Sequence, residues 1–137
     1  MEKAFAKQMT SLDGVFEFLD QYMTRQGIDA ATAYSVNLAV EEFFTNMVKY
    51  SGGRRDDVLI SIASDGRLLT VRLVDRDTDP FDITGARTGH VDDLTRPLHE
   101  RRVGGLGIHL AKEMVDSLSY EHANRQSTIT FTMNLEK

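Results

Sequence analysis

The chain has 137 residues with 0 Cys and 4 scattered His, which excludes disulfide scaffolds, zinc ribbons, iron–sulfur clusters and thiol nucleophiles. Its 16 Lys and Arg against 21 Asp and Glu give a formal net charge of -5, which argues against a protein that binds nucleic acid directly through a basic face. A hydrophobic content of 41%, no apolar run of membrane-spanning length and no signal-peptide core predict one globular domain over residues 1–137, located in the cytoplasm and without membrane contact.

The N-terminal part of the chain predicts a strand followed by two helices. Apolar and polar residues alternate loosely over Lys3–Met9, which predicts the first strand. Thr10 or Ser11 can then cap a helix, because a side-chain oxygen accepts a hydrogen bond from a free N–H of the first turn. Asp29 is placed to cap a second helix, which we expect to run to about Tyr50, where Ser-Gly-Gly follows.

The middle of the chain predicts a β-hairpin and then a long polar segment. Val58–Ala63 and Leu68–Val74 are rich in β-branched and aliphatic residues, and the Asp65–Gly66 pair between them is a strong hairpin turn signal. From Asp75 to about Val103 the sequence is polar, carries both prolines and shows no periodicity. A segment of that length is usually a functional loop, and we expect a mobile lid over residues 82–103.

The C-terminal part predicts a third helix and a second hairpin. The helix follows a glycine-rich segment and ends near Ser117, and Leu118–His122 and Thr128–Leu135 form the hairpin. The resulting order is strand, helix, helix, two strands, loop, helix, two strands. This order predicts an α+β two-layer sandwich, in which helices cover one face of a mixed, largely antiparallel sheet.

Glu42 and Asn46 form the first candidate functional group. They lie four residues apart on the second helix, so they share a face with Cβ atoms about 5–6 Å apart. A carboxylate beside an amide oxygen can hold a magnesium ion with its waters and orient a nucleophile. The alternative is an ordinary solvated helix surface. Glu41 lies about 100° round the helix from Glu42, and we expect it to face solvent.

Two further segments could contact a ligand. Asp75 and Asp77 lie where a strand ends, and a fixed carboxylate can accept a hydrogen bond from the amino group of adenine; an acidic turn is the alternative. Later, glycines at the start of the third helix allow a close approach of backbone N–H groups to phosphate oxygens, with two arginines beside them. The residues of this segment are Arg101, Arg102, Gly104, Gly105, Leu106 and Gly107. The alternative for the arginines is a solvated loop.

Taken in order, the three segments resemble the sequence boxes of the GHKL ATPase superfamily, and most closely the anti-sigma-factor serine/threonine kinases of bacterial sporulation and stress responses. The resemblance runs from about Phe5 to Leu135. The first box, Glu-x-x-x-Asn, is matched by Glu42 and Asn46. The second is matched by Pro80-Phe81-Asp82, and the third, Gly-Gly-Leu-Gly-Ile-x-Leu, by Gly104 through Leu110.

The resemblance implies a role for each matched residue. Glu42 would be the general base, and Asn46 would bind Mg²⁺ and the nucleotide. Asp75, with Asp77 as second choice, would contact adenine. The segment from Arg101 to Gly107 would bind the phosphates of ATP.

Two departures leave an alternative function open. The second box lacks its glycine and carries one inserted residue, and Tyr50 stands where family members often have His. The altered box could weaken ATP binding.

The implied function is an ATP- and Mg²⁺-dependent serine kinase that acts by partner switching. It would sequester a sigma factor and phosphorylate a serine of an anti-anti-sigma protein of the STAS type, with a possible homodimer formed through the sheet. Against the dimer, Lys3 and Lys7 could guard the edge of the first strand. The alternative is a catalytically weak or inactive nucleotide-binding module of the same fold that holds a partner. A sensor kinase is a more remote reading, because 137 residues leave little room for dimerisation helices and a phosphoacceptor His.

Overall fold

A computed structural model describes residues 1–49, 57–76 and 112–135. The elements in chain order are β1 (Glu2–Phe5), a 3-10 turn η1 (Met9–Ser11), α1 (Leu12–Arg25), α2 (Ala30–Lys49), β2 (Val58–Ser64), β3 (Leu68–Asp75), β4 (Ser117–Ala123) and β5 (Gln126–Asn134). Residues 112–114, just before β4, are helical. The expected lid at 82–103 and the beginning of the third helix lie outside the described residues.

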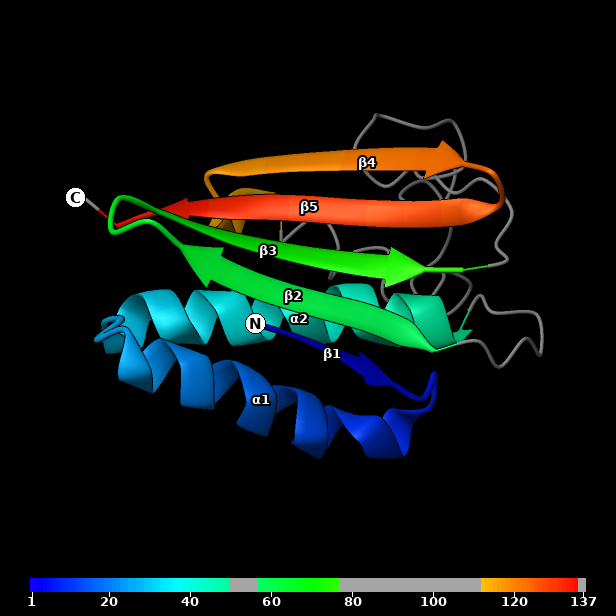
Figure 1. Cartoon of the computed structure of the whole chain (residues 1–137), viewed down its shortest axis with the longest axis horizontal. Coiled ribbons are helices and arrows are strands. Elements are labelled where there is room, and N and C mark those ends of the chain that lie inside the picture. The colour runs from blue at the N-terminus through cyan, green and yellow to red at the C-terminus, as the bar shows by residue number, and fades with distance from the viewer. Residues whose placement is uncertain (50–56, 77–111, 136–137) are drawn as a thin grey trace, which may run out of the picture.

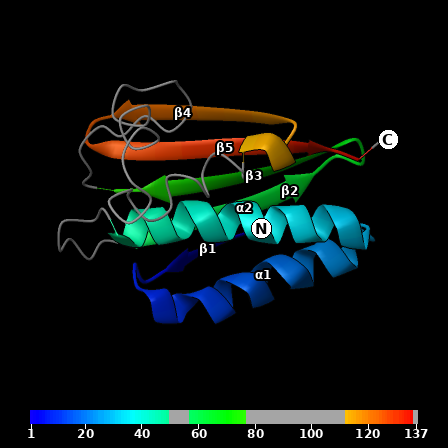
Figure 2. The same ribbon diagram turned by 180° about the vertical axis from the view of Figure 1, so that it is seen from behind.

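The five strands form one sheet in the order β1-β2-β3-β5-β4, and α1 and α2 lie together on one of its faces (Figures 1 and 2). This confirms the predicted α+β two-layer class. The four pairings among the described strands are all antiparallel. The sequence pattern predicts a mixed, largely antiparallel sheet, whereas these strands contain no parallel pairing. Strands joined by a tight hairpin must pair antiparallel, and β1 runs antiparallel to β2, its neighbour among the described strands.

The core lies between the helices and the sheet face that they cover. Alternate residues of β2, β3 and β5 point to this face, as the period of two of a strand requires. They are Val58, Ile60, Ile62, Leu69, Val71, Leu73, Ile129, Phe131 and Met133. From the helix layer, Phe43 of α2 packs on Phe131 with ring centroids 5.8 Å apart, and Phe18 of α1 meets Phe5 of β1 edge-on at 5.6 Å. These contacts fix α2 across the middle of the sheet and α1 beside β1.

The ends of the helices partly follow the sequence prediction. Asp29 caps α2 as expected, since its Oδ2 accepts from the backbone N–H of Thr32 at 3.1 Å. Ser11 occupies the N-cap position of α1 but makes no capping bond; its hydroxyl donates instead to the carbonyl of Ala6 at 2.7 Å. Gly27, in the connection between the two helices, has φ +68°, a conformation that glycine adopts without steric cost.

Both predicted hairpins are confirmed. In the first, Gly66 has φ +94°, and the Asp65 carboxylate accepts from two backbone N–H groups of the turn. In the second, Asn124 and Arg125 both have positive φ, as a two-residue type I′ turn requires. None of the described helices is long and apolar enough to cross a bilayer.

Candidate functional site

Three of the predicted site residues lie in the described part of the chain. Glu42 and Asn46 belong to the C-terminal half of α2, and Asp75 is the last residue of β3. The C-terminal end of α2 and the end of β3 lie at the same end of the molecule (Figure 1), and α2 packs against β3. The other predicted residues, Asp77, Arg101, Arg102, Gly104, Gly105, Leu106 and Gly107, lie outside the described residues.

Asn46 presents a buried acceptor. The residue is 5% exposed, and its Nδ2 donates to the backbone carbonyl of Glu42 at 2.6 Å. Because only the nitrogen can donate, this bond determines which way the amide is turned. Its Oδ1 is buried and has no hydrogen-bond partner among the described residues. A buried acceptor without a donor is costly, so the arrangement suits a cation or a donor supplied by a ligand.

The amide oxygen of Asn46 fits a magnesium ion. Mg²⁺ prefers oxygen ligands, keeps several waters and is usually held by one or two protein groups together with substrate phosphates. The described residues contain no cluster of three or more His, Asp or Glu that could enclose a metal on their own. A site built on Asn46 and on nucleotide phosphates is therefore the kind that these residues could provide.

Glu42 carries a perturbed carboxyl group. Partial burial raises its pKa above the ordinary value of 4.5, the neighbouring charge of Glu41 raises it further, and Lys49 opposes both effects. A higher pKa makes the carboxylate a stronger base at neutral pH. Glu41 was expected to face solvent, yet both glutamates are only partly exposed, so burial does not distinguish them. Helical phase does, because Glu42 shares the face of Asn46.

Asp75 is buried at 4% exposure and forms an ion pair with Lys7. The distance from Lys7 Nζ to Asp75 Oδ1 is 2.5 Å, and the side chain of Lys7 is 0% exposed. The expectation that Lys7 guards a strand edge is therefore wrong: β1 ends at Phe5, and Lys7 turns inward in the connection that follows. Lys3, in contrast, is exposed, with its ammonium 5.5 Å from the centre of the Phe5 ring.

Sequence reasoning also missed a pair of hydroxyl groups, one of which belongs to the residue opposite Asp75. Ser127 of β5 lies directly opposite Asp75 in the sheet, is buried, and has its hydroxyl 3.1 Å from that of Tyr120 in β4. Alternation along the last hairpin could have placed Ser127 on the covered face. Its pairing with Asp75, however, joins residues 52 positions apart and requires the register of the sheet.

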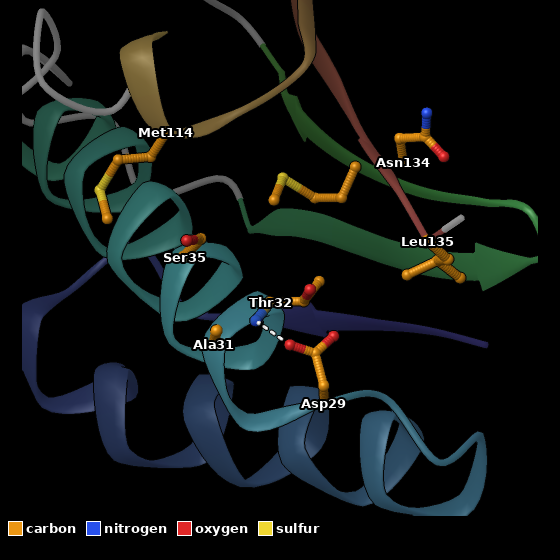
Figure 3. A pocket seen from close by; sticks show the side chains of 8 residues that line it. Asp29, Ala31, Thr32, Ser35, Met114, Asn134 and Leu135 are labelled. Carbon is orange, nitrogen blue, oxygen red and sulfur yellow. Dashed lines mark hydrogen bonds between the residues drawn. The ribbon is translucent and has the colours of Figure 1, made fainter. Parts of the chain in front are cut away.

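A hollow with a volume of about 340 Å³ lies at the other end of α2 (Figure 3). It is lined by Asp29, Ala31, Thr32, Ser35, Met114, Met133, Asn134 and Leu135. Thr32 and Asn46 are fourteen residues apart on one helix, a separation of roughly 21 Å at 1.5 Å per residue. Asn134 pairs with Leu68, at the end of β3 opposite to Asp75. The hollow is therefore separate from the residues discussed above.

Comparisons with known proteins agree with the fold. A family model described as "Histidine kinase-like ATPase domain" matches residues 5–133. No curated protein sequence matches the chain.

Three solved structures are similar in fold. The RsbU and RsbW domains of Rv1364c from Mycobacterium tuberculosis align with a TM-score of 0.70 at 16% identity, covering 98% of this chain and 32% of that one. This chain thus spans about a third of that protein. A chain of the SiaB–SiaC complex from Pseudomonas aeruginosa aligns with a TM-score of 0.58 at 13% identity, covering 98% of this chain and 88% of that one. Acinetobacter baumannii histidine kinase AdeS aligns with a TM-score of 0.55 at 11% identity, covering 100% of this chain and 68% of that one.

Proposed function

The chain belongs to the histidine kinase-like ATPase domain family, and from that membership we propose that it is an ATP- and Mg²⁺-dependent serine protein kinase. The observation that carries the proposal is the pair on α2: a partly buried carboxylate with a raised pKa, one helical turn before a buried amide oxygen that has no partner among the described residues. A general base beside a group able to bind a metal is what transfer of a phosphoryl group to a hydroxyl needs.

Each residue has a role in this proposal. Asp75 accepts a hydrogen bond from the amino group of adenine, and Asn46 Oδ1 binds the magnesium ion. Arg101, Arg102 and the segment Gly104–Gly107 bind the phosphates; they are proposed on their sequence pattern alone. When bound, Mg²⁺ neutralises charge on the phosphate oxygens.

Glu42 would accept the proton of the serine hydroxyl as the serine oxygen attacks the γ-phosphorus of ATP; the bond from that phosphorus to the bridging oxygen breaks, and ADP leaves. Burial supports this role, because a partly desolvated carboxylate holds a proton more readily than an exposed one. Asn46 supports it indirectly: its amide is bonded to the carbonyl of Glu42, so the two groups keep a fixed relation on the helix.

The proposed partners are a sigma factor, which the protein sequesters, and an anti-anti-sigma protein of the STAS type, which it phosphorylates. Support comes from the resemblance of the sequence boxes and from the fold shared with an RsbW domain and with the SiaB–SiaC complex. We further propose a cytoplasmic location and a possible homodimer formed through the sheet. The competing function is a nucleotide-binding module without transfer activity, which the altered second box favours.

Calorimetry with a non-hydrolysable ATP analogue, with and without Mg²⁺, tests nucleotide binding. We expect Asn46→Ala to weaken binding in the presence of Mg²⁺ and to have little effect without it. Asn37→Ala is the matched control: its Oδ1 is likewise buried without a partner among the described residues, but Asn37 lies nine residues before Asn46 on the same helix and donates to Asp20. No heat at millimolar nucleotide, with or without Mg²⁺, would contradict the proposal.

A further inference from the structure

Lys7 is a buried cation that the proposed reaction does not use. Its ammonium group lies 2.5 Å from Asp75 Oδ1, and its side chain is 0% exposed. Lys is almost never fully buried unless it is paired, because removing a charge from water is costly. The placement follows from the sheet: Phe5 is opposite Val58, and Val58 is opposite Asp75. Lys7, two residues after Phe5, thus reaches across the end of β2 to the end of β3.

We propose that Lys7 is a positioning residue that determines base specificity: its ammonium keeps Asp75 an ionised carboxylate, and this carboxylate selects a purine with an amino group at C6 over one with an oxo group. This inference rests on the proposed binding of ATP and goes beyond it. Lys7 acts through Asp75 and does not itself contact the base.

The first step of the argument concerns the chemistry of the carboxyl group. An ionised carboxylate only accepts hydrogen bonds, whereas a protonated one also donates. Asp75 is buried, and a buried carboxylate without a nearby cation tends to take up a proton. The ammonium of Lys7 removes that tendency. A carboxylate has about four acceptor positions, so Asp75 can hold Lys7 and a purine amino group together.

The second step concerns the neighbours of Asp75. Ser127 lies opposite Asp75, and its hydroxyl and that of Tyr120 are 3.1 Å apart, with either atom able to donate. Hydroxyl groups can rotate to suit a donor or an acceptor, so they discriminate poorly between amino and oxo groups. The fixed polarity at this point comes from Asp75, and the pair with Lys7 maintains it.

Binding of ADP and IDP to the full chain, measured by calorimetry, tests the inference. The two nucleotides differ at C6 and N1 of the purine, and neither donates a γ-phosphate. In the wild type we expect IDP to bind on the order of 10- to 100-fold more weakly, because the oxo group leaves a buried acceptor unsatisfied. In Lys7→Met we expect ADP affinity to fall about tenfold while IDP affinity changes little. The reason is that Asp75, a charged acceptor beside Lys7, becomes a neutral carboxyl group that can also donate a hydrogen bond.

Two further variants separate specificity from folding. Lys7→Arg keeps the positive charge and should restore the preference for ADP. The double variant Lys7→Met/Asp75→Asn buries no charge at this point, so it should fold even if Lys7→Met does not, and it should bind ADP and IDP with similar affinity.

The possible failures can be told apart. A wild type that binds neither nucleotide refutes the proposed function and this inference with it. A wild type that binds ADP, with the same preference over IDP retained in Lys7→Met, refutes the role of Lys7 alone. A uniform loss of affinity for both nucleotides in Lys7→Met has the same meaning, because a purely structural ion pair would produce it. The same preference retained in the double variant refutes the adenine contact of Asp75 as well.

Discussion

Replacing Lys7 by Met should destabilise the fold strongly. The substitution keeps the apolar stem of the side chain and removes the ammonium, so the Asp75 carboxyl group stays buried without its counter-ion and must take up a proton or remain an uncompensated charge. Both side chains are almost fully removed from solvent, at 0% and 6% exposure. Removing one partner of a buried ion pair costs about 3–5 kcal/mol.

The expected change in melting temperature follows from the length of the chain. At about 2.1 cal/mol/K per residue, 137 residues give an unfolding entropy of roughly 0.29 kcal/mol/K, so each kcal/mol lowers the Tm by about 3.5 °C. Lys7→Met should therefore lower the Tm by roughly 10–17 °C. Differential scanning calorimetry at neutral pH measures this shift.

Lys3→Met provides the matched control for this experiment. Lys3 lies in β1, four residues before Lys7, and is exposed, so its replacement should change stability by less than about 1 kcal/mol. The double variant Lys7→Met/Asp75→Asn should recover much of the stability that Lys7→Met loses, because it leaves no unpaired buried charge. If Lys7→Met melts within a few degrees of Lys3→Met, the buried ion pair does not exist as described, and the reasoning fails.

Three further predictions concern Glu42, its neighbour and the cap of α2. Glu42→Gln should keep nucleotide affinity in calorimetry and lose phosphoryl transfer, whereas Glu41→Gln should retain transfer; the opposite result would mean that the base is Glu41. The transfer rate should rise with pH as Glu42 loses its proton, and Glu41→Gln should move that rise to lower pH, because the charge of Glu41 raises the pKa of Glu42; an unchanged profile would contradict the coupling. Asp29→Ala should lower the Tm at neutral pH, because the bond to Thr32 holds the pKa of Asp29 below its ordinary value of 3.8. This bond stabilises the fold above that value and loses its effect as the pH falls below it, so a destabilisation that persists undiminished in acid would contradict the capping role.

The parts of the fold that local chemistry determines could be predicted from the sequence. Asp65–Gly66 specifies a turn because Gly adopts the positive φ that the turn needs, and Asp29 caps α2 through a bond to a residue three positions away. The spacing of Glu42 and Asn46 is also local, since one helix carries both. Each of these features depends on a few consecutive residues, and the sequence displays them directly.

The surroundings of Asp75 depend on long-range pairing and could not be predicted in the same way. Lys7 lies within the alternating segment Lys3–Met9, which predicts a strand, and a lysine on an edge strand is usually exposed. Lys7 is buried because β1 ends at Phe5, before Lys7, and because only β2 lies between β1 and β3 in the sheet. The side chain of Lys7 can therefore reach Asp75 at the end of β3. Ser127 lies beside Asp75 through the register of β3 and β5. Neither relation can be inferred from spacing along the chain.

Phosphoryl transfer tests the central claim most directly. Purified protein is incubated with Mg²⁺ and ATP labelled on the γ-phosphate, together with a candidate anti-anti-sigma protein of the STAS type, and the label on the second protein is measured for the wild type and for Glu42→Gln. The account predicts label on a serine with the wild type, and none with Glu42→Gln or when Mg²⁺ is chelated. Transfer that is equal in the two proteins, or no transfer from a wild type that binds ATP and the partner, would contradict it.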